Sequence, residues 1–546
     1  MSTLTDQSSP LLDVDATFDG GGDPREDVRA EPNYRALALG WVVIATVVRL
    51  WIARLPMGNG EAYYFSWSRF LDWSYYDHPP LLAWIIRVTT ALGTSPATVR
   101  LGPVLAAGAF GYLFYRLAER MFRPRAAFFA LVIVTALPVF LFSSFVVNPE
   151  APLAPLWVAF LLTIDGMRNR DEAYRPLLAG LLLGLAFLSK YTAVLLVPAS
   201  LIYIAMSLPM RRWLRRPSFY AGGAVALAMA MPVLIWNQTR GWPSVRLHLV
   251  ERVGVAVPAA GENTLNHLVE IGSSPGTSLL QSLGRVLVGQ LLAYSPLLAP
   301  LLVIVLVRSF KRARRDDRDL FITAFTWPVL LPLLAAMVQL KDAEMHWTMM
   351  ASVPAAIGVG GMLDAGWETA KRTRMVAIAG VSLTAVAFLL SNIHASSPVI
   401  VRMLPRDHYD PRADMINELV GWDQVRASVA QAANATPGSV VLAANHYALC
   451  GRLMYEMGDD PQVYCPTARR SAYDFFGRHD PPADATVIAL TTDIHGELPA
   501  GLSDRKCAVS DQVDVERGGI HVARYFVQSC PPVPRECEPG ERASRD

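Results

Sequence analysis

Eleven apolar runs dominate the chain and limit what it can fold into. A bilayer core needs a helix of about 20 apolar residues, and only helices and closed barrels satisfy their backbone groups there. The runs are Arg35–Leu55, Thr98–Leu117, Ala126–Phe145, Ala151–Met167, Pro176–Leu188, Tyr191–Leu208, Ser218–Trp236, Val286–Val307, Leu320–Val338, Trp347–Leu363 and Met375–Ile393. The sequence therefore predicts a polytopic α-helical membrane protein with about eleven transmembrane helices. The shorter segment Leu81–Leu92 is expected to be interfacial or re-entrant.

The composition agrees with a membrane-embedded protein. Of 546 residues, 52% are hydrophobic and only 18% are charged, which is unlike a soluble enzyme. No nucleic-acid motif and no basic stripe with interleaved aromatics is present, so a nucleic-acid partner is set aside.

Positive charges predict the orientation of the chain, because Lys and Arg collect on the cytoplasmic side of a membrane. Five loops are rich in these residues, around Arg120–Arg125, Arg168–Arg175, Arg211–Arg216, Arg308–Arg318 and Lys371–Arg374. With these loops inside, the N-terminus is cytoplasmic, and loops 55–97 and 237–284 and everything after Ile393 are periplasmic. Residues 1–32, rich in Asp, Gly, Ser and Pro, are predicted to be disordered.

The part after the last apolar run has a different pattern. A helix at about Trp422–Ala435, short strands at Ser439–Ala444 and Thr486–Thr492, and a β-rich segment ending near Cys530 predict a small periplasmic α/β domain over 394–533. The charged residues 534–546 are expected to form a flexible tail. All five cysteines lie in this part, so one or two disulfides are expected; unpaired buried cysteines are the alternative.

The loop Leu55–Trp84 collects carboxylates and nine aromatic rings just after the first apolar run. Glu61 opens a predicted surface helix, where it either serves a site or favours the helix N-terminus. Asp77 and His78 precede two prolines, which fix an extended corner. His78 either faces an anion or bonds a backbone carbonyl, and Asp77 favours its protonated form.

Two further charges lie at the ends of apolar runs on the same predicted side. Glu150 stands in a turn between two runs, where it is either functional or solvated. Lys190 is the only charge between Arg175 and Arg211, and it either snorkels or meets an anionic ligand such as a phosphate.

Three further basic residues, Arg240, Lys341 and His346, lie in loops on the same predicted side and are weaker candidates for the site. The chain has no GxGxxG, Walker A, HExxH or GxSxG motif, which argues against soluble-nucleotide chemistry. No cofactor and no metal ligand set is assigned, and a divalent metal stays open.

These motifs resemble those of the polyprenyl-phosphate-dependent glycosyltransferases of the GT-C fold, which include protein O-mannosyltransferases and the lipid A aminoarabinose transferase. The resemblance covers about Tyr34 to Ile393 and runs through EAYYFSWSRFLDWSYYDHPPLLAW, NPEAPL, LAFLSKYTA, LIWNQTRGWPS, GQLLAYSPLL and HWTMMASVP. It implies a GT-C transmembrane domain over 33–393. Two departures stand out: Gly60 occupies the place of a favoured catalytic Asp, and His78 that of a Lys.

The resemblance implies an inverting transfer of a sugar from polyprenyl phosphate. A carboxylate then acts as base or orients the acceptor, and cations neutralise the departing phosphate. It implies Glu61, Asp77 and Glu150 as catalytic candidates. The substrate-binding candidates are Tyr64, His78, Lys190, Tyr191, Arg240, Lys341 and His346.

The predicted function is therefore a bacterial inner-membrane glycosyltransferase acting on the periplasmic side. Its donor is a polyprenyl-phosphate sugar, and its acceptor is a lipid or envelope glycan, with protein second. One alternative is a lipid or glycan transporter or flippase, which predicts charges midway along spans and two related halves; most charges here lie at span ends, Arg49 excepted. Another is a catalytically silent GT-C-like binding protein.

Overall fold

A computed structural model describes residues 32–248, 279–340, 343–403, 409–458, 462–467, 470–493, 498–499, 501–503 and 505–533. Most of the predicted disordered segment 1–32, most of loop 237–284 and all of the predicted tail 534–546 lie outside the described residues.

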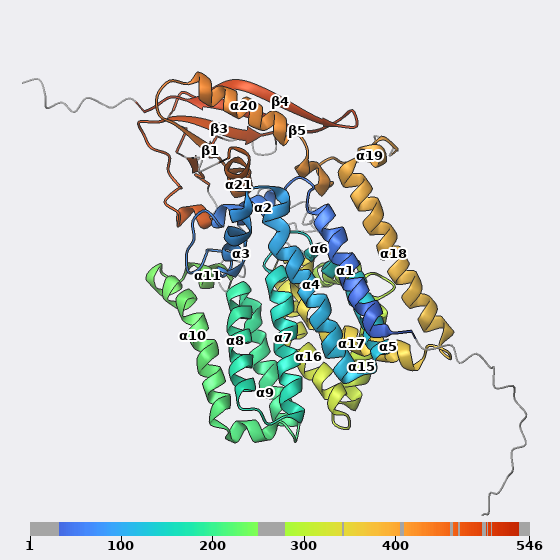
Figure 1. Ribbon diagram of the computed structural model, residues 1–546. Coiled ribbons are helices and arrows are strands. Elements are labelled where there is room, and N and C mark those ends of the chain that lie inside the picture. Colours follow the sequence, from blue (N-terminus) through green and yellow to red (C-terminus); the bar gives the residue numbers. More distant parts are fainter. Residues whose placement is uncertain are drawn as a thin grey trace, which may run out of the picture.

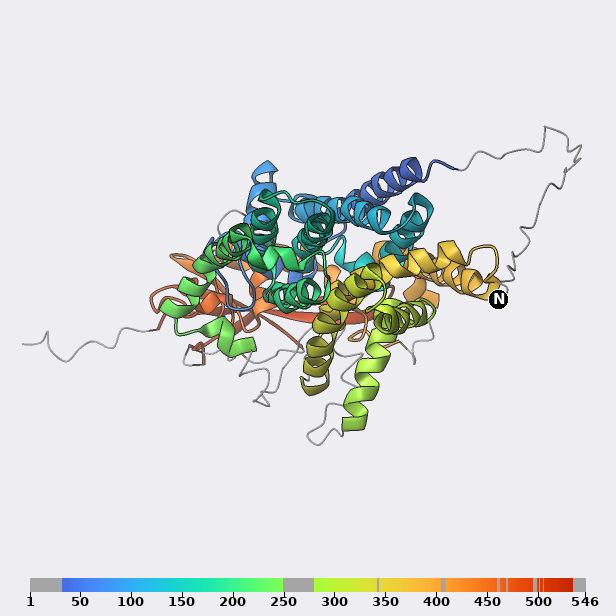
Figure 2. The same ribbon diagram turned by 90° about the horizontal axis from the view of Figure 1, so that it is seen from below.

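Within the described residues, seven helices are long and apolar enough to cross a membrane. They are α1 (Tyr34–Ile52), α4 (Pro96–Met121), α7 (Glu150–Asn169), α10 (Pro217–Thr239), α16 (Asp317–Gln339), α17 (Ser352–Ala365) with the 3₁₀ turn Met345–Ala351 before it, and α18 (Lys371–Ser396). They run roughly side by side in Figure 1, and Figure 2 shows the bundle from below. The chain is a multi-pass membrane protein.

All eleven predicted runs are helical, but four are broken or short. α14 (Leu279–Tyr294) and α15 (Ala299–Arg312) are bent by 103° at their junction, where Ser295 adopts a φ of 65° before Pro296. The other three are α5 (Pro124–Ala136), α8 (Tyr174–Ser189) and α9 (Leu196–Met206) with its leading 3₁₀ turn Tyr191–Leu195. The expected count of about eleven long spans becomes seven, or eight with the bent pair, among the described residues.

Short helices complete the bundle and its connections. They are α6 (Pro138–Ser143), α11 (Pro243–Arg246), α19 (Val399–Met403) and the 3₁₀ turns Thr90–Leu92, Arg211–Arg215 and Met415–Leu419. Pro138 ends α5 because a proline disfavours helical conformation in the residue before it.

Two short helices, α2 (Asn59–Trp67) and α3 (Leu81–Thr89), form the loop between α1 and α4. This loop is called the outer loop below, after its predicted side. The predicted surface helix starting at Glu61 is therefore α2, which begins two residues earlier. The corner Asp77-His78-Pro79-Pro80 lies in the irregular segment between α2 and α3, as the two prolines predict.

The C-terminal part is an α/β domain, as the sequence predicts. Its five-stranded sheet has the order β2-β1-β3-β5-β4. β1 is parallel to β2 and β3, whereas β5 is antiparallel to β3 and β4. The elements are α20 (Trp422–Ala435), β1 (Val440–Ala444), α21 (Tyr447–Glu456), β2 (Val463–Tyr464), the 3₁₀ turn Ala472–Asp474, β3 (Thr486–Thr492), β4 (Ala508–Arg517) and β5 (Ile520–Cys530).

Two disulfides cross-link this domain, one joining Cys450 to Cys465 and the other Cys507 to Cys530. Four of the five cysteines are thus paired, so of the expected one or two disulfides the structure has two. Cys537 lies outside the described residues.

The C-terminal domain sits on the outer loop, with α21 directly above α2 (Figure 1). Tyr63, Trp67 and Tyr75 of the loop belong to the same hydrophobic core as Trp422 and Leu453 of the domain. The loop and the domain therefore form one packed unit, which the sequence did not predict.

A glycine permits this close packing. A Cβ on Gly451 in α21 would lie 2.7 Å from the backbone nitrogen of Tyr63 in α2. Arg452 adds a polar tie, since its Nη1 donates to the carbonyl of Met57 at 2.5 Å, and its guanidinium stacks on Trp422 at 4.3 Å.

Candidate active site

Glu61 in the first turn of α2 is buried, and hydrogen bonds saturate its carboxylate. Oε2 accepts the N–H of Gly58 at 2.9 Å, and Oε1 accepts the N–H of Val147 at 3.0 Å. Arg100, near the start of α4, donates Nε to Oε1 at 2.8 Å and Nη2 to Oε2 at 2.5 Å. A carboxylate accepts about four such bonds, so Glu61 has no capacity left for a substrate proton in this arrangement.

The Glu61–Arg100 pair fixes the outer loop to the bundle. Burial by itself raises the pKa of Glu61, but the charge and hydrogen bonds of Arg100 bring that pKa below its usual value. Arg100 also donates to the carbonyls of Ala53, Leu55 and Pro56. The end of α1 and the start of α2 are thereby held by one guanidinium.

Asp77 is half-buried and is held by groups from three parts of the chain. Its Oδ2 accepts the hydroxyl of Tyr63 at 2.6 Å, and that hydroxyl accepts the N–H of Ala472 at 2.9 Å. Its carbonyl accepts Nε2–H of His248 at 2.8 Å. The C-terminal domain thus reaches Asp77 through the hydroxyl of Tyr63.

His78 lies among aromatic rings. Its ring centroid is 6.2 Å from that of Tyr64 and 6.1 Å from that of His248. His248 in turn lies 5.4 Å from Tyr191, whose hydroxyl is 3.1 Å from Oγ of Ser74. The structure therefore brings the predicted site residues Tyr64, His78 and Tyr191 together.

Glu150 and Lys190, which are buried, and His346, which is partly exposed, form a second cluster at the ends of three separate helices. Lys190 at the end of α8 forms an ion pair with Oε1 of Glu150 at the start of α7. Nε2 of His346 lies 2.9 Å from the same oxygen and 3.1 Å from Oε2 of Glu344. Oε2 of Glu150 is buried and has no hydrogen-bond partner within the described part of the chain.

Tyr64 connects the two clusters. Burial raises its pKa well above the ordinary value, and the negative charges of Glu344, Asp77 and Glu150 raise it further. A phenol close to three carboxylates stays neutral, so Tyr64 is a hydrogen-bond donor at neutral pH. Tyr64 thus lies beside the ring of His78 and within electrostatic reach of Asp77 and Glu150. The convergence of Glu61, Asp77, His78, Glu150, Lys190, Lys341 and His346 on one face stays a prediction.

Two predicted residues are not placed with these clusters. Arg240 at the end of α10 donates to Asp72 at 3.0 Å and stacks on Trp236 at 4.7 Å, and Trp236 also donates to Asp72. These contacts fix the loop to α10. Lys341 lies outside the described residues.

Three residues near the site were not assigned a role from the sequence. Arg100 is the only charge between Arg87 and Arg116, which is the kind of isolated charge that marks a buried partner. His248 had no comparable signal. Arg49 was noted as a charge inside a run; it is buried, donates to Ser144 at 2.7 Å, and lines a cavity of about 20 Å³ together with Glu150.

No cluster of three His, Cys, Asp or Glu side chains arranged to hold a metal ion is found among the described residues. The site therefore offers ionic and hydrogen-bonding groups: the Asp77 carboxylate, the His78 imidazole, the Tyr64 phenol and the Lys190–Glu150–His346 cluster.

Comparisons with known proteins find a family model that covers several residues of this site, and a relative of similar sequence. The model of the dolichyl-phosphate-mannose-protein mannosyltransferase family matches residues 77–236, which include the Asp77-His78 corner, Glu150 and Lys190. A lipid A galacturonosyltransferase, RgtD of Rhizobium johnstonii, is 28% identical over 316 residues. That alignment covers 57% of this chain and 62% of the relative, so it spans less than two thirds of the relative's length.

Two solved structures share the fold. Apo ArnT from Cupriavidus metallidurans superimposes with a TM-score of 0.58, over 90% of this chain and 98% of ArnT. ArnT bound to undecaprenyl phosphate gives 0.61, over 91% and 98%. Both are 15% identical to this chain, which shows a common fold. These comparisons confirm the resemblance predicted from the sequence, to the polyprenyl-phosphate-dependent glycosyltransferases of the GT-C fold.

Proposed function

We propose that the chain is a membrane glycosyltransferase that moves a sugar from a polyprenyl-phosphate donor to a lipid or envelope-glycan acceptor on the periplasmic side of a bacterial inner membrane. The observation that carries this proposal is that Tyr64 lies beside His78 and within electrostatic reach of Asp77 and of Glu150, which itself pairs with Lys190 and His346. The family-model match, the lipid A galacturonosyltransferase relative and the ArnT fold support it.

In the proposed reaction, an acceptor hydroxyl oxygen attacks the anomeric carbon of the donor sugar. The bond from that carbon to the phosphate oxygen breaks, and the polyprenyl phosphate leaves with the electron pair. Asp77 takes the hydroxyl proton, because its side chain is only half-buried and can be reached by an acceptor, whereas Glu61 is buried and all four of its acceptor sites are filled. Glu61 then positions the loop that carries Asp77.

His78 and Lys190 stabilise the negative charge that develops on the departing phosphate. Lys190 is held by its ion pair with Glu150, so the buried ammonium is positioned to meet a phosphate. Tyr64 donates to the phosphate or to the sugar. His346 contacts the same oxygen of Glu150 as Lys190 does, so it neutralises the Glu150 carboxylate when Lys190 turns to the donor.

The acceptor that fits best is a lipid with a sugar headgroup, in line with the lipid A galacturonosyltransferase relative. The alternatives are a transporter or flippase and a catalytically silent GT-C-like binding protein. Apart from the two chain neighbours and the backbone of its own helix, no described atom lies within 4 Å of the position that a Cβ on Gly60 would occupy. Gly60 itself carries no carboxylate, and the silent protein stays an alternative for this reason.

Mass spectrometry of envelope lipids and glycans tests the proposal. Cells lacking this chain are expected to lose one sugar mass from one lipid or glycan, and expression of the wild-type chain should restore it. An Asp77→Asn variant expressed at the same level should fail to restore it. An unchanged envelope in the deletion strain would contradict the proposed enzyme, and full restoration by Asp77→Asn would favour a binding or transport role.

A further inference from the structure

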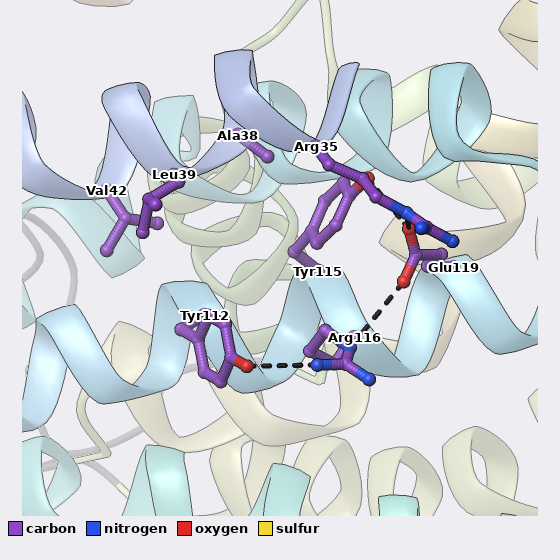
Figure 3. A pocket seen from close by; sticks show the side chains of 8 residues that line it. All are labelled: Arg35, Ala38, Leu39, Val42, Tyr112, Tyr115, Arg116 and Glu119. Atoms are coloured by element: carbon purple, nitrogen blue, oxygen red, sulfur yellow. Dashed lines mark hydrogen bonds and ion pairs between the residues drawn. The ribbon is translucent and has the colours of Figure 1, made fainter. Parts of the chain in front are cut away.

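A second pocket lies between α1 and α4 (Figure 3). Its residues come from the start of α1 and the end of α4, whereas the candidate active site lies near the end of α1 and the start of α4. It has a volume of about 320 Å³ and opens between the two helices. The pocket residues of α1, Arg35 to Val42, lie roughly 15–26 Å along the helix axis from its last residue, Ile52. Its lining residues are Arg35, Ala38, Leu39, Val42, Tyr112, Tyr115, Arg116 and Glu119.

The polar rim of the pocket carries more positive than negative charge. Nε of Arg35 lies 2.6 Å from one oxygen of Glu119, and Nε of Arg116 lies 3.5 Å from the other. Two guanidinium groups thus share one carboxylate, which leaves one positive charge unbalanced within this group. The side chains of Arg35 and Arg116 are 72% and 46% exposed, so both can meet a further anion.

The other wall of the pocket is apolar and continues onto the outer surface of the bundle. Ala38, Leu39 and Val42 form it, and Leu39 is 56% exposed. Only 17% of the α1 span is buried, so most of this helix faces the bilayer. Tyr112 is neutral and accepts Nη1–H of Arg116 at 3.0 Å. Tyrosines are enriched at the headgroup level of membranes.

We propose that this pocket binds one anionic glycerophospholipid, such as phosphatidylglycerol. Its phosphate lies between Arg35 and Arg116, and an acyl chain lies along Leu39 and Val42. The pairing of a cationic rim with an apolar wall matches an anionic lipid in both parts of its structure. With the predicted orientation, the lipid comes from the cytoplasmic leaflet, across the membrane from the site of sugar transfer.

Native mass spectrometry of the delipidated full-length protein tests the site, with phosphatidylglycerol and phosphatidylcholine of the same chain length as probes. We expect phosphatidylglycerol to bind more tightly than phosphatidylcholine. Each arginine near a charged headgroup contributes about fivefold, so Arg35→Gln with Arg116→Gln should weaken phosphatidylglycerol binding about 25-fold. Arg308→Gln, which removes an exposed arginine of α15 outside the pocket, should leave binding unchanged.

A second variant has the opposite expected sign. Glu119→Gln releases both arginines from their shared carboxylate, so it should tighten phosphatidylglycerol binding about fivefold. General damage to the fold would not tighten binding. Equal binding of phosphatidylcholine, an unchanged affinity in the double variant, weaker binding in Glu119→Gln, or full competition by inorganic phosphate would each overturn the proposal.

Discussion

Replacing Glu61 by Gln separates a positioning role from a catalytic one. In the wild-type chain, the buried guanidinium of Arg100 meets both carboxylate oxygens. Gln keeps the shape of the side chain but removes the negative charge, which leaves Arg100 buried without its ionic partner. Breaking one side of a buried ion pair costs about 3–5 kcal/mol. We therefore expect the variant to melt at a temperature several degrees lower and to lose transfer in proportion to unfolding.

A double variant sharpens this prediction. Arg100→Leu in the Glu61→Gln background removes the unpaired charge, so part of the lost stability should return. Recovery should be incomplete, because Arg100 also holds the carbonyls of Ala53, Leu55 and Pro56. Thermal unfolding in detergent, followed by tryptophan fluorescence, measures the stability of each variant, and transfer assayed well below the melting temperature measures activity.

The control is Glu368→Gln, which removes an exposed glutamate near the other end of the bundle and should change neither quantity. A Glu61→Gln protein with the wild-type melting temperature and transfer reduced more than a hundredfold would refute the positioning role. Glu61 would then act in the chemistry itself.

The lowered pKa of Glu61 gives this pair a defined pH dependence. The folded protein binds fewer protons at Glu61 than the unfolded chain, so the stabilisation is complete above the unfolded pKa of about 4.3. It is lost as the pH falls through the lower, folded value. Between about pH 5 and 3 the wild-type chain should lose more stability than Glu61→Gln; parallel losses would contradict the ionised, Arg100-bound carboxylate.

Three further substitutions test the site. Gly60→Asp should fold normally, because no described atom beyond its chain neighbours and its own helix backbone lies within 4 Å of the added carbon, and because an acidic group favours a helix N-terminus. It should raise the transfer rate if a base is limiting there; an unchanged rate would leave Asp77 as the base. Gly451→Ala should reduce both melting temperature and transfer, because the added carbon would lie 2.7 Å from backbone of α2; wild-type behaviour would show that the domain docks differently. Lys190→Met should reduce transfer at least a hundredfold, because it removes the ammonium that meets the phosphate and leaves Glu150 without its ion-pair partner. Binding of radiolabelled donor measures the loss of the phosphate contact. Unaltered donor binding would remove Lys190 from the phosphate site.

The elements of the fold could be predicted from periodicity and apolar length. Helix α20 and strand β3 begin and end at the predicted residues, because each is a clear pattern bounded by polar or turn residues. The bend between α14 and α15 was not predicted, since a run of apolar residues does not reveal where the backbone turns. The structure shows that turn at Ser295 and Pro296.

The site could be predicted in part. The positive-inside pattern and the isolated charges were enough to predict that Glu150, Lys190 and His346 lie on one side of the membrane, and these three side chains, from separate loops, are in contact. The contact of Tyr63 with Ala472 joins residues 409 positions apart, and no local pattern signals such a pairing. The saturation of Glu61 also escaped prediction, because Val147 and Arg100, which donate to it, are brought near it only by folding.

One measurement tests the central claim most directly: transfer of radiolabelled sugar from a polyprenyl-phosphate donor to an acceptor lipid by the purified protein in vesicles. Galacturonosyl donor with lipid A is the first pair to use, given the galacturonosyltransferase relative. We predict label in the acceptor lipid with the wild-type chain and background label with Asp77→Asn at equal melting temperature. Full transfer by Asp77→Asn would contradict the account of the site, and no transfer from any polyprenyl-phosphate sugar would contradict the account of the function.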